Sequence, residues 1–281
     1  MLSDSGMSNK DYKKLIAEHF NSRSQYGVGT PHSGLVERLI ELYPPQPNER
    51  VLDSATGTGF VAISVANIIG PLGVVLGIDI SPSMLEQAKA AAARHDLSRR
   101  INFMLADAEH LPTDLGQFDR IYCANAIPYL RDVRGTLRKW RNLLKPSGFI
   151  AFNCWQENSY ATGRLLRQIA ATNGIVVAEV GVEAGTPEHC ENLLRSAGYD
   201  QIIVKVEPTH LYVQSKQLEN FTEMTLSNPL YGISPAERAS LLALVPEYQT
   251  ALFSDEVQED FGAERGAYFV SARAGSADRT F

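Results

Sequence analysis

The stretch Val51-Leu-Asp-Ser-Ala-Thr-Gly-Thr-Gly-Phe60 decides the fold of this chain. Its first residues are apolar, as in a buried strand, and Phe60 begins a segment of helical periodicity that runs to Ile69. Between them, Gly57 and Gly59 allow a tight turn and the close approach of a ligand. A helix that follows such a turn directs its first backbone N–H groups at an anionic group. The stretch therefore predicts a strand, a ligand-binding glycine loop and a helix, in that order.

Strand and helix patterns alternate along the rest of the chain. The predicted strands are Arg50–Asp53, Val74–Asp79, Ile101–Leu105, Ile121–Cys123, Phe149–Cys154, Gln201–Val206 and Ala267–Ala272. The predicted helices are Phe60–Ile69, Ser83–Arg94, Asp132–Leu144 and a short one that begins after Thr186 and ends at Gly198. Strands that alternate with helices are typical of a parallel sheet covered on both faces.

The length of 281 residues suits one large α/β domain, and we predict a single domain over 1–281 in three parts. An N-terminal helical cap spans 1–46. An α/β core spans 47–207 and regains its last strand at 266–273. A helical insertion at 208–265 separates the last two strands, and its segment 215–262 has a helical pattern.

Composition excludes several classes of protein. The chain has 26 basic and 32 acidic side chains, and this net charge of −6 disfavours a nucleic-acid partner, because a phosphate backbone needs clustered positive charge. No signal peptide and no apolar run of membrane-spanning length is visible. Three cysteines without Cys-x-x-Cys spacing indicate reduced thiols, and six histidines without zinc-ligand spacing predict no metal site. We therefore expect a cytoplasmic protein with no membrane span.

The glycine loop alone leaves two cofactors open. Gly57-Thr-Gly59-Phe-Val-Ala62 satisfies the G-x-G-x-x-G/A pattern of dinucleotide-binding proteins, and Asp79 follows about 20 residues later. An NAD-dependent oxidoreductase is therefore one alternative. Asp53, at the end of the first strand, favours the other. A carboxylate there repels a pyrophosphate but attracts the ammonium and sulfonium groups of S-adenosylmethionine.

Two further acids follow neighbouring strands. Asp79 ends the second predicted strand, and its carboxylate oxygens suit the vicinal hydroxyls of a ribose. Asp107 follows the third strand and can accept a hydrogen bond from an adenine amino group, while Ile80, Met84 and Ala108 offer apolar walls. Because ligands of open α/β sheets bind outside the carboxyl ends of the strands, these residues predict one nucleoside site.

Five segments in order resemble the motif series of the class I S-adenosylmethionine-dependent methyltransferases. They are VLDSATGTGF, VVLGIDISPSMLEQA, INFMLADAEHLP, FDRIYCANAIPYLRD and LLKPSGFIAF, and they are most similar to the small-molecule branch that includes the ubiquinone/menaquinone C-methyltransferases. The terminal AYFVSARA resembles the closing antiparallel strand of that family. The resemblance implies an α/β fold with a Rossmann-like, seven-stranded, doubly wound sheet whose last strand is antiparallel, with N-terminal helices and a helical insertion before the last strand.

The same resemblance implies S-adenosylmethionine as the cofactor and gives roles to individual residues. It implies that the methionine moiety is surrounded by Asp53, Ser54, Ala55, Gly57 and Gly59, and that Asp79 binds the ribose. It further implies that the adenine contacts Ile80, Met84, Asp107 and Ala108. Cys123 is expected beside the sulfonium, and Tyr26 on the cofactor carboxylate. One departure is visible, because Ala55 stands where the family usually has a glycine. We interpret the added methyl group as tolerated.

The segment Asn125-Ala-Ile-Pro128-Tyr129 invites comparison with the N-P-P-Y loop of enzymes that methylate planar amides and adenines. Two residues separate Asn125 from Pro128, whereas that loop has at most one. We therefore interpret the segment as a turn with a packed tyrosine.

The function implied is transfer of a methyl group to an oxygen, nitrogen or carbon atom of a small-molecule acceptor. A non-catalytic S-adenosylmethionine-binding partner protein is a further alternative. We predict that residues 215–245 form part of a lid over the acceptor. His32, in the first turn of a helix begun by Thr30-Pro31, is the candidate general base for an acceptor that must lose a proton. The identity of the acceptor and the oligomeric state are not encoded in a recognisable pattern.

Overall fold

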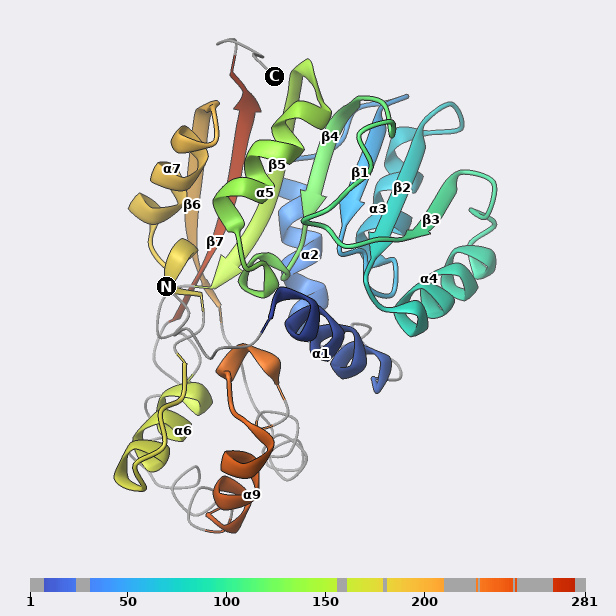
Figure 1. Ribbon diagram of the computed structural model, residues 1–281. Coiled ribbons are helices and arrows are strands. Elements are labelled where there is room, and N and C mark those ends of the chain that lie inside the picture. Colours follow the sequence, from blue (N-terminus) through green and yellow to red (C-terminus); the bar gives the residue numbers. More distant parts are fainter. Residues whose placement is uncertain are drawn as a thin grey trace.

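The computed structural model contains a seven-stranded sheet of order β3-β2-β1-β4-β5-β7-β6 (Figure 1). It describes residues 8–23, 31–155, 161–178, 181–209, 226, 228–244, 246 and 265–275, and only the backbone at 31, 32, 161–165, 209, 235 and 265. Strands β1 to β5 pair in parallel with their neighbours, whereas β7 pairs antiparallel with both β5 and β6. The predicted Rossmann-like sheet with an antiparallel last strand is confirmed.

The observed elements follow the predicted ranges closely. The strands are β1 (Arg50–Ser54), β2 (Val74–Asp79), β3 (Ile101–Leu105), β4 (Phe118–Cys123), β5 (Leu144–Trp155), β6 (Tyr199–Thr209) and β7 (Arg265–Ala274). The helices are α1 (Asn9–Asn21), α2 (Pro31–Leu42), α3 (Phe60–Ile69), α4 (Pro82–Arg94), α5 (Val133–Leu143), α6 (Ala161–Thr172), α7 (Pro187–Ser196) and α9 (Pro235–Ala243), with 3₁₀ turns η1 (Ile127–Tyr129), η2 (Val182–Ala184) and η3 (Pro229–Tyr231). Strand β5 begins earlier than predicted, because Leu144 already pairs with β4 before an irregularity in register and Phe149 resumes the pairing.

Successive side chains of the strands point to opposite faces of the sheet, and both faces are covered. Leu52 and Ile121 are fully buried in the core cluster that contains α5 and α7. Their neighbours Val51 and Tyr122 are fully buried in the cluster that contains α2 and α3. With both faces covered, the loops at the carboxyl ends of the parallel strands are the place where this fold binds ligands.

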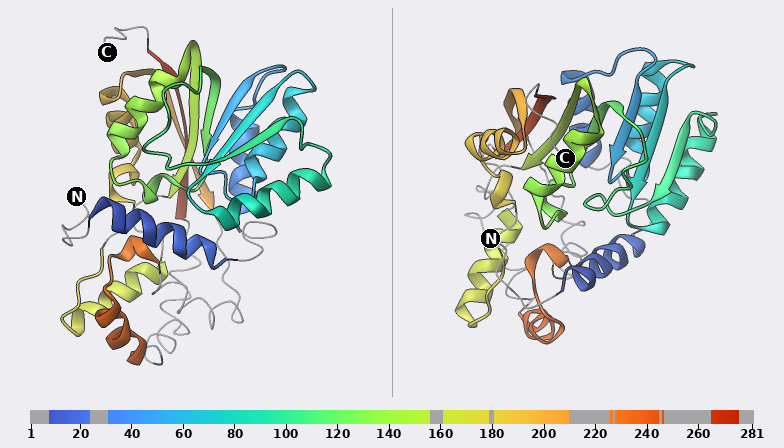
Figure 2. Two further views of the ribbon diagram at one scale, coloured as in Figure 1. Left: turned by 45° about the vertical axis from the view of Figure 1, so that its right-hand side comes forward. Right: turned by 45° about the horizontal axis from the view of Figure 1, so that its top comes forward.

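Helix α1 lies across these carboxyl ends, as Figures 1 and 2 show from three directions. Its C-terminal end is attached to the start of α4. The side-chain oxygen Oδ1 of Asn21 accepts hydrogen bonds from the hydroxyl of Ser81 at 2.7 Å and from the backbone N–H of Ser83 at 3.3 Å. These two hydrogen bonds therefore help to hold the N-terminal cap over the carboxyl ends of the strands, in addition to the chain connection.

Helices α6 and α9 lie on the far side of α1 from the sheet (Figure 2). They share a small hydrophobic cluster in which Leu166 and Ile169 of α6 meet Tyr231 and Leu241. The helix α6 was not predicted from the sequence, and its residues fall within the range predicted for the α/β core. Within the predicted insertion 208–265, the structure describes the start of β7 at 265, the end of β6 at 208–209, and residues 226, 228–244 and 246.

Candidate active site

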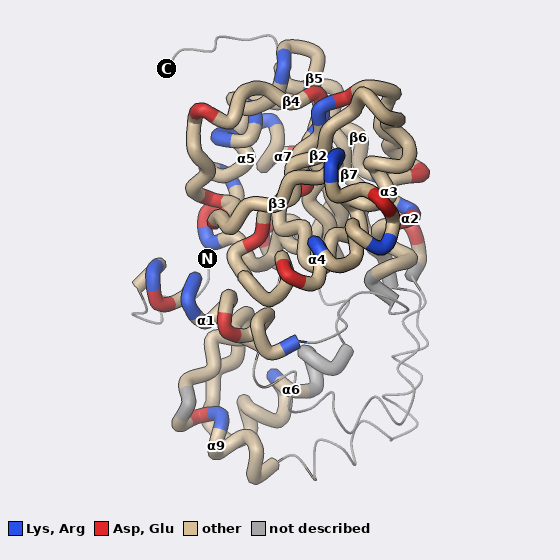
Figure 3. Tube along the Cα trace, turned by 90° about the vertical axis from the view of Figure 1, so that its right-hand side faces the viewer, with Lys and Arg blue, Asp and Glu red and all other residues tan. Residues whose placement is uncertain are grey.

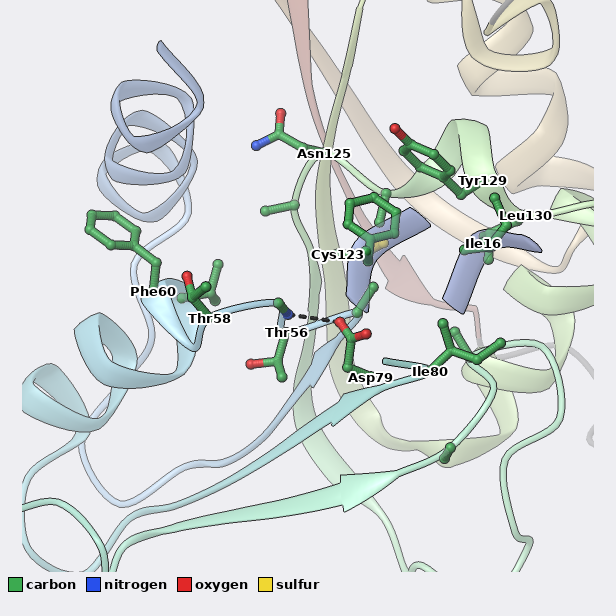
Figure 4. Close-up of a pocket in the computed structure, with 18 of the residues that line it drawn as sticks. Ile16, Thr56, Thr58, Phe60, Asp79, Ile80, Cys123, Asn125, Tyr129 and Leu130 are labelled. Atoms are coloured by element: carbon green, nitrogen blue, oxygen red, sulfur yellow. Dashed lines mark hydrogen bonds between the residues drawn. The ribbon is translucent and has the colours of Figure 1, made fainter. Parts of the chain in front are cut away.

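A cavity of about 1060 Å³, including its open mouth, lies at the carboxyl ends of β1 to β4 (Figure 4). The chain order of the strands reverses between β1 and β4, and such switch points are the usual ligand sites of open α/β sheets. Helices α1 and α2 contribute walls on the other side. The described lining residues are Lys13, Ile16, Phe20, Ser33, Val36, Ala55, Thr56, Gly57, Thr58, Phe60, Val61, Asp79, Ile80, Ala106, Asp107, Ala108, Cys123, Ala124, Asn125, Ala126, Tyr129 and Leu130.

The loop between β1 and α3 is left-handed at three positions. Ala55 has a φ of 57°, Gly57 of 54° and Gly59 of 83°. A Cβ atom at Gly59 would lie 3.1 Å from Cβ of Ala88, whereas a Cβ atom at Gly57 would meet no described atom within 4 Å. Gly59 is therefore required both for its backbone conformation and for packing on α4. The open space at Gly57 is part of the cavity.

Asp79, at the end of β2, holds this loop. Its Oδ2 atom accepts a hydrogen bond from the backbone N–H of Gly57 at 2.8 Å, and its Oδ1 atom accepts from the N–H of Ser81 at 2.9 Å. Burial raises the pKa of Asp79, and these two backbone donors oppose that rise. Each carboxylate oxygen has a second lone pair, so Asp79 can still accept hydrogen bonds from a ligand in the cavity.

Asp53 lies beneath the loop and is only 1% exposed. Its Oδ2 atom accepts from the hydroxyl of Thr56 at 2.5 Å and from the N–H of Ala62 at 3.1 Å. Its Oδ1 atom is buried and has no hydrogen-bond partner among the described residues. Burial raises the pKa of Asp53 to about 7, and the neighbouring Asp79 carboxylate adds to the rise. A buried carboxylate oxygen without a donor favours a nearby cation.

The loop after β3 is joined to α1 by an ion-pair cluster. Lys13 of α1 contacts both Asp107, at 3.4 Å, and Glu109, which is 3% exposed. Burial raises the pKa of Asp107, but hydrogen bonds from the Glu109 N–H and His110, together with Lys13, hold its pKa below the usual value. Asp107 is therefore an ionised acceptor on the cavity wall, and α1 is fixed over it.

The wall beyond β4 is built from a turn and an amide pair. Cys123 is 1% exposed, and burial raises the pKa of its thiol, which keeps it neutral. Asn125 follows with a left-handed φ of 56° and exchanges two hydrogen bonds with the fully buried Asn153 of β5. Tyr129 packs edge-on against Phe20 of α1, with ring centroids 5.2 Å apart. Its hydroxyl accepts from Asn228 of the predicted insertion at 3.4 Å.

The structure brings most of the predicted site residues to this cavity. Those on its wall are Ala55, Gly57, Asp79, Ile80, Asp107, Ala108 and Cys123. Asp53, Ser54, Gly59 and Met84 lie behind that wall and are not among its described lining residues. Tyr26 lies outside the described residues, and α2 includes His32 by its backbone only, next to the lining residue Ser33.

Sequence reasoning missed the residues that α1 and the turn after β4 contribute. Lys13, Phe20 and Tyr129 line the cavity, and none of them was predicted to have a role in the site. Asn125 was set aside as part of a turn. The apolar periodicity of α1 did not indicate a site, because Ile16 and Phe20 at helical spacing are equally typical of core packing.

No group of three side chains suitable for a metal ion occurs within the described ranges. In the same part of the chain, no helix is long and apolar enough to cross a membrane.

Comparison with known proteins identifies the kind of site. A family described as a methyltransferase domain matches residues 51–148. Aklanonic acid methyltransferase DauC of Streptomyces sp. (strain C5) is 34% identical over 152 residues, which cover 52% of this chain and 67% of that protein. The ubiquinone/menaquinone biosynthesis C-methyltransferase UbiE of Ectopseudomonas oleovorans is 33% identical over 142 residues, 48% of this chain and 84% of that protein.

A longer but weaker match covers much of the chain. Nocamycin O-methyltransferase of Saccharothrix syringae is 26% identical over 230 residues, which cover 74% of this chain and 80% of that protein. Among solved structures, the (4+2)-cyclase SpnF superposes with a TM-score of 0.57 at 18% identity, over 96% of this chain and 97% of that one. At that identity, the superposition shows a shared fold.

Proposed function

The chain belongs to the class I S-adenosylmethionine-dependent methyltransferases, and from that membership we propose where it binds the cofactor and the acceptor. The protein is an enzyme that transfers the methyl group of S-adenosylmethionine to a small molecule. Membership in this family excludes the NAD-dependent oxidoreductase and the non-catalytic binding protein as readings of the glycine loop.

We propose that the cofactor occupies the half of the cavity formed by the ends of β1, β2 and β3. The observation that carries this proposal is the buried Oδ1 atom of Asp53, which lacks a partner among the described residues. The ammonium and sulfonium groups of S-adenosylmethionine supply the positive charge that such an oxygen favours. The space in front of Gly57 and the carboxylate of Asp79 suit the ribose, and Asp107 suits the adenine amino group.

The acceptor then occupies the half formed by α1, α2 and the turn after β4. Bound in the half proposed for it, S-adenosylmethionine would supply a methyl group already activated by the sulfonium. Transfer would form a bond from the acceptor atom to the methyl carbon while the carbon–sulfur bond breaks with its electron pair left on sulfur, and a hydroxyl acceptor would also release its proton. Holding the acceptor in line with that carbon is worth on the order of 7–11 kcal/mol. Positioning is therefore the main task of this chain.

We further propose that residues 215–245 act as part of a lid and that His32 is the base for an acceptor that must lose a proton. The hydrogen bond between Asn228 and Tyr129 supports the first, since it links the insertion to a cavity residue. The position of Ser33 on the cavity wall supports the second. Relatives named for O- and C-methylation favour oxygen or carbon as the acceptor atom.

We propose that nucleic acid is not a partner of this protein. In Figure 3 the basic and acidic residues of the described chain are interspersed along the tube. The net charge of −6 also disfavours binding to a negatively charged phosphate backbone.

Labelled S-adenosylmethionine tests the proposed function directly. The protein is incubated with methyl-labelled cofactor and a fractionated metabolite extract, and mass spectrometry locates the labelled product. We expect S-adenosylhomocysteine to form together with one labelled small molecule. Release of S-adenosylhomocysteine without any labelled product, or no binding of the cofactor at all, would count against the assignment.

A further inference from the structure

The amide pair of Asn125 and Asn153 joins the ends of β4 and β5 at the cavity wall. The backbone N–H of Asn125 donates to Oδ1 of Asn153 at 3.0 Å, and Nδ2 of Asn153 donates to Oδ1 of Asn125 at 2.7 Å. Asn153 is fully buried, whereas Asn125 lines the cavity. Two reciprocal bonds and a left-handed backbone hold the Asn125 side chain in one orientation.

This network decides which end of the Asn125 amide is available to a ligand. Because Oδ1 of Asn153 accepts from a backbone N–H, the other atom of that amide must be a donor, and it meets the oxygen of Asn125. The oxygen of Asn125 thus already accepts one hydrogen bond, from Nδ2 of Asn153. Its Nδ2 atom, with two N–H donors, has no acceptor among the described residues. In Figure 4 the amide stands on the far side of Cys123 from Asp79, in the half of the cavity proposed for the acceptor.

The second polar group of this half is also a donor. Tyr129 Oη accepts from Asn228, so its own O–H remains to donate. The lining residues Ile16, Ala126 and Leu130 of this half are apolar. Lys13, the cation among the described lining residues, is engaged by Asp107 and Glu109. The acceptor half therefore combines an apolar surface with hydrogen-bond donors, and its described residues offer no carboxylate to an ammonium group.

We propose that Asn125 binds an oxygen atom of the acceptor and selects an apolar molecule that bears a hydroxyl over the corresponding amine. The inference rests on the proposed function. An acceptor oxygen offers lone pairs to the N–H groups of Asn125 and to the O–H group of Tyr129. An amino group instead points its own N–H groups at these donors, which are then left without a hydrogen-bond acceptor. An unpaired donor in an apolar site costs more than the lost bond, and so one amide discriminates between the two acceptors. Asn153 acts through Asn125 and is a positioning residue.

Binding of 2-naphthol and 2-naphthylamine to the complex with S-adenosylhomocysteine tests this assignment, because the two probes share one ring system. Calorimetry on the native protein should give about tenfold tighter binding of 2-naphthol. Asn125→Gly tolerates the left-handed backbone and should bring the two affinities within about twofold. Asn125→Asp exchanges the free donor for an acceptor and should reverse the preference. Asn48→Gly, which changes an exposed left-handed asparagine at the opposite end of β1, should keep the native preference.

The outcomes separate this inference from the proposed function. If S-adenosylhomocysteine binds neither the native protein nor the variants, the proposed function fails. If it binds but the native complex binds both probes equally, or neither, Asn125 has no such role. A tenfold preference that survives in both Asn125→Gly and Asn125→Asp overturns the assignment as well. If Asn125→Gly does not fold, the reversal in Asn125→Asp decides alone.

Discussion

Asp79 and Gly57 are joined by a 2.8 Å hydrogen bond from the backbone N–H of Gly57 to Oδ2 of Asp79. This bond connects the end of β2 to the loop that follows β1. The carboxylate that is proposed to bind the ribose therefore also fixes the loop beside which the rest of the cofactor lies. Loss of Asp79 should act through both effects.

The first prediction follows from this double role. Asp79→Ala should weaken binding of S-adenosylmethionine by at least tenfold, since hydrogen bonds to a charged group contribute about 1.5–3 kcal/mol each. Asp79→Asn is the matched variant. It keeps an oxygen that can accept from Gly57 and should lose less affinity than Asp79→Ala. Calorimetric titration measures both, and native affinity in Asp79→Ala would remove this residue from the site.

The second prediction concerns pH. Asp53 has a pKa of about 7 in the folded protein and about 3.9 in an unfolded chain. Between these values the folded state binds more protons, so this residue makes the free energy of unfolding fall as pH rises from about 4 to 7. The free energy of unfolding falls by at most about 4 kcal/mol over this range. Asp53→Asn cannot ionise, and the variant should gain stability relative to the native protein as pH rises.

Urea unfolding of the ligand-free protein and of Asp53→Asn at pH 4.5, 5.5, 6.5 and 7.5 measures this difference. The comparison of two proteins at each pH cancels the titration of other groups. A stability difference that is constant over this range would contradict the raised pKa of Asp53.

The third prediction concerns the insertion. Deleting residues 215–245 and closing the gap with a short Gly/Ser linker should abolish methyl transfer, because the acceptor loses its cover and its positioning. Binding of S-adenosylhomocysteine should stay within several-fold, since the proposed cofactor half belongs to the sheet. Asn228→Ala is the milder control and should lower turnover without changing cofactor affinity. A folded deletion variant with normal turnover would exclude a lid.

The fourth prediction concerns the base. If the acceptor is a hydroxyl, His32→Ala should lower the rate at neutral pH by about 10²–10⁴-fold, the usual contribution of a positioned base. The deficit should shrink as pH rises, because the acceptor then ionises unaided. His95→Ala, a change at the C-terminal cap of α4, is the control and should behave as the native protein does. Native rates in His32→Ala across the pH range would leave His32 without a catalytic role.

The bounds of several strands were predictable because their signals are local, whereas the antiparallel direction of the last strand came from the family resemblance. Val74–Asp79 and Ile101–Leu105 are apolar runs bounded by turn residues, and both agree with β2 and β3 to the residue. The early start of β5 was not predictable. Lys145-Pro-Ser-Gly148 has the composition of a turn, yet Leu144 pairs with Phe118 across the sheet. A pairing of this kind depends on the partner strand, so the sequence of the segment itself does not indicate it.

The acids of the proposed cofactor half were predictable as a group for the same reason, since they follow the ends of consecutive strands. The residues of the proposed acceptor half were not, because they come from α1, α2, the turn after β4 and the insertion. The cysteines illustrate the same limit. Cys154 and Cys190 are distant in sequence, but their sulfur atoms lie 3.7 Å apart in the core, and both donate to the carbonyl oxygen of Ala184.

The left-handed alanine at position 55 has a consequence for how long a product stays bound. A non-glycine residue in this region of backbone space costs about 1–2 kcal/mol, and any loop conformation that releases Ala55 from it recovers that energy. Strain of this kind shortens the residence time of whatever the loop encloses. Ala55→Gly should slow the dissociation of S-adenosylhomocysteine by up to about tenfold in stopped-flow displacement. Ala90→Gly on the exposed side of α4 should leave that off-rate unchanged. The alanine would then make the enzyme quicker to exchange spent cofactor for fresh.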